Sequence, residues 1–141
     1  NVAKNIKAWL SNDTSLTQLP TKDWTVHEWL FFINNLPKDI ELERLIELDN
    51  QYQLTESGNN EIAHAWLLLN IIKNNPAVNA RLDSYLVSIG RRKLIVPLYR
   101  ALLEDNTKLD FTQEIYDRAR PGYHPLAQGT IDALFLKIKS D

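Results

Sequence analysis

Apolar side chains in this 141-residue sequence recur at helical spacing along almost the whole chain. In residues 2–10, for example, Val2, Ile6, Trp9 and Leu10 fall on one face of a helix. The strict alternation of apolar and polar residues that indicates a half-buried β-strand is scarce. The spacing therefore predicts an all-α fold of about eight short amphipathic helices. A chain of this length has room for one domain with its own core, over residues 1–141.

Capping residues and prolines mark the boundaries of these helices. Thr25 and Glu28 have the spacing of a capping box, and Pro37 ends the helix that the box begins. Asn75 and Pro76 form an N-cap followed by proline at the first helical position. The other N-caps that the sequence predicts are Asp39, Asn60 and either Asp110 or Thr112. His124-Pro125 is predicted to open the last helix, with His124 fixing its approach.

Short connections join successive helices, which favours antiparallel pairs. Helix pairs of about 35–45 residues are typical of an armadillo- or HEAT-like right-handed superhelix. Such an array binds its partners along one concave face. We expect this arrangement here.

Composition excludes several classes of function. The net charge is −2, which favours neither nucleic acid nor an anionic membrane as a partner. The longest apolar runs, such as residues 66–69, are too short to span a bilayer. The chain has no Cys, so disulfides, zinc–thiolate sites and thiol nucleophiles are excluded.

The charge is nevertheless unevenly distributed. Residues 38–61 hold seven acids and two bases, whereas residues 81–100 hold five bases and the single acid Asp83. This separation of acidic and basic segments favours a protein that binds its partner along one edge of its surface.

Known catalytic motifs are missing from the sequence. His27-Glu28 begins like the zinc motif H-E-x-x-H, but Phe31 occupies the place of the second histidine. There is no glycine-rich phosphate loop, and no serine elbow. We therefore predict no catalytic residue and no metal ligand in this chain.

The basic turn, residues 90–93 with the sequence Gly-Arg-Arg-Lys, is the most informative short segment. Gly90 is predicted to be the left-handed C-cap of the preceding helix. The next helix is predicted from about Leu94 to Leu103, with Pro97 in its first turn. Cations at a helix N-terminus cost roughly 0.3–1 kcal/mol each, so stability alone does not explain them. The turn is either an anion-binding site or a solvated basic loop.

Three segments in order resemble the C-terminal helical domain of leukotriene A4 hydrolase and related M1-family zinc aminopeptidases. They are Asn59-Asn60-Glu61-Ile62 followed by Trp66-Leu67, the basic turn followed by Pro97-Leu98, and His124-Pro125 near the chain end. The resemblance covers most of the chain and is clearest from about Ile40 onward.

The resemblance implies a C-terminal domain excised from a longer M1 peptidase. Such a domain packs on an upstream catalytic domain and closes one side of its substrate tunnel. The zinc site and the other catalytic motifs of that family lie upstream, so the zinc cofactor belongs to the parent aminopeptidase. The fragment alone is expected to be inactive. Relatives of this kind are mostly cytosolic, so the cytoplasm is the expected compartment.

The resemblance also assigns a role to the basic turn. The first basic residue after the glycine, Arg91 here, binds the carboxylate of the peptide substrate, and Lys93 assists it. The family member used for comparison has an apolar residue where this chain has Arg92, so Arg92 is a second candidate. The alternative function is a free-standing helical-repeat module that binds an acidic peptide through Arg91–Lys93.

Overall fold

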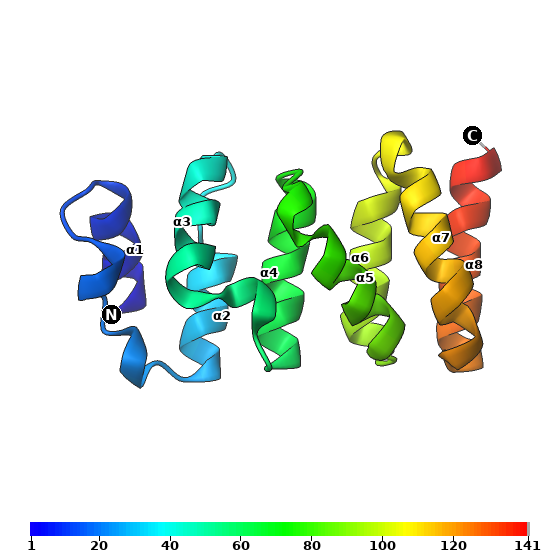
Figure 1. The fold of residues 1–141 in the computed structure, drawn as a ribbon, viewed down its shortest axis with the longest axis horizontal. Helices are drawn as coiled ribbons and strands as arrows, with labels where there is room; N and C mark the ends of the chain where they lie inside the picture. Colours follow the sequence, from blue (N-terminus) through cyan, green and yellow to red (C-terminus); the bar gives the residue numbers. More distant parts are fainter. Residues whose placement is uncertain (141) are drawn as a thin grey trace. The chain divides into compact units, whose positions relative to one another are not determined.

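The computed structural model describes residues 1–140 (Figure 1). Within that range it contains eight α-helices and no β-strand, which confirms the predicted all-α fold. The helices are α1 (Val2–Leu10), α2 (Val26–Asn34), α3 (Leu42–Tyr52), α4 (Asn60–Ile72), α5 (Asn79–Ser88), α6 (Arg92–Leu103), α7 (Leu109–Ala119) and α8 (Pro125–Ser140). No helix among the described residues is long and apolar enough to cross a bilayer.

The chain divides into two compact units. The first runs from Asn1 to Leu69 and the second begins at Asn70, so their boundary falls within α4. The armadillo-like superhelix and the single excised domain stay predictions.

The first unit is built around aromatic side chains on α1, α2 and α4. Trp9, Phe32 and Trp66 are each at least 99% buried, with Leu45 and Leu48 of α3 in the same cluster. A buried polar chain runs through this core. The indole nitrogen of Trp66 donates to the Thr55 hydroxyl at 2.9 Å, and that hydroxyl donates to the Asp49 carboxylate at 2.6 Å. The core thus satisfies the polar groups that it buries.

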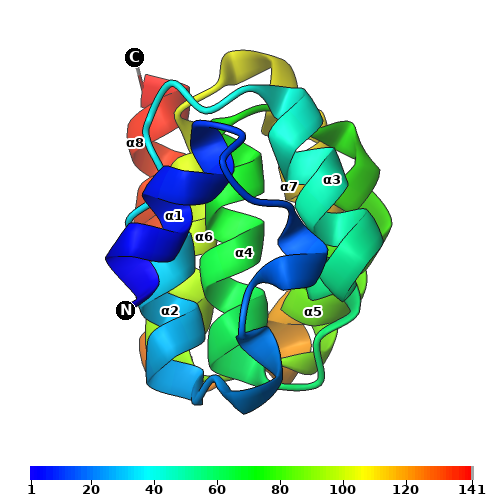
Figure 2. The ribbon, with the colours of Figure 1, turned by 90° about the vertical axis from the view of Figure 1, so that its left-hand side faces the viewer.

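In the second unit, α6 and α8 lie side by side in one layer and α5 and α7 in the other (Figure 2). The face that α6 buries carries residues at helical spacing: Leu94, Ile95, Leu98, Tyr99, Leu102 and Leu103. Tyr116 of α7 and Phe135 of α8 stack with their ring centroids 5.0 Å apart. Four helices therefore share one core, and the basic turn lies at its edge, between α5 and α6.

Two of the predicted helix starts are confirmed. The Thr25–Glu28 capping box is present in both directions at the start of α2. The Asn75 side chain accepts from the Ala77 amide at 3.1 Å and caps the 3-10 turn Pro76–Val78, which continues directly into α5 at Asn79. The His124 ring nitrogen Nδ1 accepts from the Leu126 amide at 3.1 Å, so His124 holds the entry to α8 as expected.

The other three predicted N-caps were wrong. Asn59, not Asn60, accepts from the amides of Glu61 and Ile62. α3 begins after Glu41 without a side-chain cap, not at Asp39.

At the start of α7, Asp105 caps a 3-10 turn at Asn106–Lys108, and the helix follows directly. Asp110 and Thr112 lie within α7, where the Thr112 hydroxyl donates to the Lys108 carbonyl at 2.8 Å. Each observed N-cap residue has other polar residues beside it in the sequence that are also able to cap. Local spacing alone therefore does not predict which of them caps the helix.

Candidate functional site

The basic turn differs from the predicted geometry in two respects. α5 ends at Ser88 and is followed by Ile89 in an extended conformation. No glycine of the described chain has a positive φ, so Gly90 is not a left-handed cap. α6 begins at Arg92 instead of about Leu94, which places Pro97 inside the helix and not in its first turn. Pro97 has no N–H to donate to the carbonyl four residues earlier, so α6 lacks one backbone hydrogen bond there. The earlier start leaves Arg91 as the N-cap residue.

Three positively charged residues lie at the N-terminus of α6. Arg91 has extended backbone angles, and its carbonyl accepts from the amides of Leu94 and Ile95 at 2.9 and 3.1 Å. No side chain caps this end of the helix, and its first turn contains no acid. Arg92 and Lys93 occupy that turn, and both are exposed. The helix dipole and three cations therefore favour an anion at this point.

The two neighbouring arginines have different surroundings. The guanidinium of Arg92 donates from Nε and from Nη2 to the hydroxyl of Thr130 in α8, at 3.1 and 2.8 Å. The Arg91 side chain is exposed and forms no hydrogen bond or ion pair with any described residue. The Arg91 guanidinium thus has no partner among the described residues, whereas Nε and Nη2 of Arg92 are bonded to Thr130.

Two buried tyrosines, Tyr99 and Tyr123, connect α6 to the last turn of α5. The Tyr123 hydroxyl donates to the Leu86 carbonyl in α5, and the hydroxyls of Tyr123 and Tyr99 are 3.0 Å apart. Because the only hydroxyl proton of Tyr123 is directed to Leu86, Tyr99 donates to Tyr123. Burial raises the pKa of both phenols, so they remain neutral donors at physiological pH.

Two ion pairs at the surface of the second unit link neighbouring elements. Arg118 of α7 binds Asp83 of α5 through two hydrogen bonds of 3.1 and 2.6 Å. Arg120 binds Asp132 of α8 in the same way at 3.0 and 2.7 Å. Hydrogen bonds from Arg120 and then from Tyr116 lower the pKa of Asp132 to about 2. Asp132 thus links α8, the helix that carries Thr130, to Arg120 and to Tyr116 of α7.

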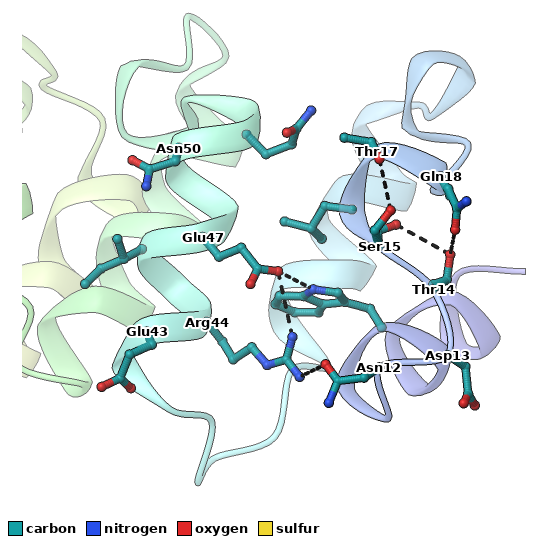
Figure 3. A pocket seen from close by; sticks show the side chains of 14 residues that line it. Asn12, Asp13, Thr14, Ser15, Thr17, Gln18, Glu43, Arg44, Glu47 and Asn50 are labelled. Atoms are coloured by element: carbon teal, nitrogen blue, oxygen red, sulfur yellow. Dashed lines mark hydrogen bonds and ion pairs between the residues drawn. The ribbon is translucent and has the colours of Figure 1, made fainter.

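An open groove of about 950 Å³ in the first unit offers a contrasting surface (Figure 3). Residues 12–18 and α3 line it, with Arg44 as its cation. The Arg44 guanidinium donates to the Asn12 side chain at 2.8 Å and lies 5.0 Å from the Trp9 ring centre. Glu47 accepts from the Trp9 indole at 2.6 Å and pairs with Arg44 at 3.7 Å.

The remaining charged side chains that line this groove are acidic, namely Asp13 and Glu43. The groove therefore disfavours a carboxylate ligand, in contrast to the basic turn. Among the described residues, no group of three or more His, Cys, Asp or Glu side chains is placed to hold a metal ion.

The family model described as leukotriene A4 hydrolase, C-terminal, matches residues 24–135. The chain belongs to this family. The match includes all three segments on which the predicted resemblance rests, and it confirms that prediction. The basic turn is therefore a feature of a leukotriene A4 hydrolase C-terminal domain.

Curated relatives are named Leucine aminopeptidase 2. The protein of Pyricularia oryzae is 24% identical over 123 residues, which is 85% of this chain and 20% of the relative. That of Neurospora crassa is 24% identical over 127 residues, covering 88% of this chain and 19% of the relative. That of Aspergillus terreus is 27% identical over 134 residues, covering 89% and 21%. The chain thus spans about a fifth of the length of these relatives.

The sequence did not predict the residues whose hydrogen bonds hold the helices on either side of the basic turn. Tyr99 and Tyr116 occupy apolar positions of their helices, and a buried tyrosine requires a hydrogen-bond partner for its hydroxyl. That signal predicts buried phenols but not their partners. Thr130 gives no signal of its own, because it is a polar residue on a half-exposed helix face.

Proposed function

We propose that this chain is the C-terminal part of a zinc aminopeptidase and that Arg91 binds the terminal carboxylate of its peptide substrate. The observation that carries the proposal is the unengaged Arg91 side chain at the uncapped N-terminus of α6. A guanidinium holds a carboxylate through two parallel hydrogen bonds, which fixes orientation as well as affinity. Lys93, exposed in the same turn, adds a second positive charge.

In this proposal the catalytic groups belong to an upstream part of the enzyme. The names of the relatives and the family match support an aminopeptidase as the parent protein. Zinc bound in an upstream catalytic domain would provide an activated water for attack on the peptide carbonyl. In this proposal the present chain packs on that domain, closes one side of the substrate tunnel and positions the far end of the peptide. The expected compartment is the cytoplasm.

The proposal predicts a selective effect of Arg91→Ala in the full-length enzyme. A charge-assisted hydrogen bond is worth roughly 1.5–3 kcal/mol, so kcat/KM for a tripeptide should fall by about ten- to a hundredfold. An aminoacyl anilide has no carboxylate to bind, and its kcat/KM should stay within about twofold. Steady-state kinetics on both substrates measure the difference.

The matched control is Arg100→Ala. Arg100 is another exposed arginine of α6 that makes no ion pair with a described residue, but it lies in the last turn of the helix. Its removal changes the net charge equally and should leave both rates unchanged. Equal losses on the tripeptide and the anilide for Arg91→Ala would contradict carboxylate recognition and indicate misfolding.

A further inference from the structure

The basic turn is tied on both sides to one short segment, residues 123–130. On the α5 side, the Tyr123 hydroxyl donates to the Leu86 carbonyl in the last turn of α5. On the α6 side, Thr130 accepts both hydrogen bonds of Arg92. The same segment therefore holds the end of one helix and the beginning of the next.

The Thr130 hydroxyl is itself held in one orientation. It donates to the Leu126 carbonyl one turn earlier in α8, at 3.0 Å. With its single proton used in this way, its lone pairs remain for the Arg92 guanidinium. The Nε and Nη2 groups of the planar Arg92 guanidinium both donate to this one fixed oxygen, which defines the direction of the Arg92 side chain.

The tyrosine contact is protected from water. Tyr99 and Tyr123 are both buried, and the Tyr99 hydroxyl donates to that of Tyr123. A chain of buried hydrogen bonds thus runs from α6 through Tyr123 to the end of α5. Such buried networks rigidify the backbone that they connect.

We propose that Arg92, Thr130 and Tyr123 are positioning residues that preset the turn so that Arg91, and not Arg92, is presented to the ligand. Arg92 held on Thr130 does not compete for the carboxylate. A preset turn also lowers the entropy that must be lost when Arg91 binds. This inference rests on the proposed function, because it takes the peptide carboxylate as the ligand of Arg91.

The test is Thr130→Val in the full-length enzyme, with Thr130→Ser as the matched control. Valine keeps the branched shape and removes the hydroxyl, whereas serine keeps the hydroxyl. Losing one hydrogen bond corresponds to about a three- to tenfold effect, so KM for a tripeptide should rise by that factor in Thr130→Val. The kcat for the tripeptide, and both constants for an aminoacyl anilide, should stay within about twofold. Thr130→Ser should restore the KM.

Three outcomes separate this inference from the proposed function. If Arg91→Ala is selective for the tripeptide but Thr130→Val behaves like the natural enzyme, positioning by Thr130 is wrong and carboxylate binding stands. If Thr130→Val lowers activity equally on both substrates together with the melting temperature, Thr130 is only structural and the inference is overturned. If Arg91→Ala itself is not selective, the proposed function fails and this inference fails with it.

Discussion

Arg91 and Arg92 are adjacent, yet the start of α6 separates their roles. Arg91 has extended backbone angles as the N-cap, whereas Arg92 is the first helical residue, so their side chains leave the backbone in different directions. Arg92 reaches Thr130, 38 residues later in the sequence, while Arg91 keeps its guanidinium exposed. The sequence predicts that basic residues gather at a helix N-terminus. It does not predict which of them is free, because the choice depends on a distant threonine.

At this scale Gly90 allows a direct test of the turn geometry. A Cβ added at Gly90 meets no atom within 4 Å, and the residue does not have a positive φ. Gly90→Ala should therefore stabilise the chain by about 0.4–1 kcal/mol, because alanine restricts the unfolded state. Urea unfolding followed by circular dichroism measures this. A loss of more than about 1 kcal/mol would show that Gly90 needs the left-handed conformation after all.

At the scale of elements, helix interiors were predictable and helix ends were less so. Periodicity placed all eight helices, because the apolar face of each is long enough to define its period. The ends lie in polar runs such as Ser57–Asn60, where several side chains are able to cap. Asn59 is the cap because the chain enters α4 one residue earlier than the pattern predicts.

The pair that joins η6, the 3-10 turn at Arg120–Gly122, to α8 predicts a pH dependence of stability. The pKa of Asp132 is lowered to about 2, from about 4 in an unfolded chain. A lowered pKa means that the carboxylate stabilises the fold fully above about pH 4 and loses this effect as the pH falls toward 2. Asp132→Asn should therefore reduce the free energy of unfolding at pH 6 but not at pH 2.

Urea unfolding of both proteins at the two pH values checks this prediction. Asp13→Asn is the control for removing one negative charge, since the Asp13 side chain has no partner among the described residues. A deficit of the same size at pH 6 and pH 2 would mean that Asp132 acts by packing and not through its charge.

At the scale of the whole molecule, the two units differ in charge. Residues 1–69 contain ten acids and five bases, whereas the remaining residues contain eight acids and eleven bases. The acidic groove of Figure 3 lies in the first unit and the basic turn in the second. The net positive charge of the second unit attracts an anionic ligand, whereas the net negative charge of the first unit repels it. This difference is consistent with the carboxylate site proposed in the second unit.

The central claim is that this chain completes an aminopeptidase by binding the substrate carboxylate. The most direct measurement is tripeptide hydrolysis by the separately produced catalytic portion of the enzyme, alone and mixed with this chain. We expect a large gain in activity on mixing with the natural chain and a much smaller gain with the Arg91→Ala chain. No gain with either chain would contradict the account and favour a free-standing module that binds acidic peptides.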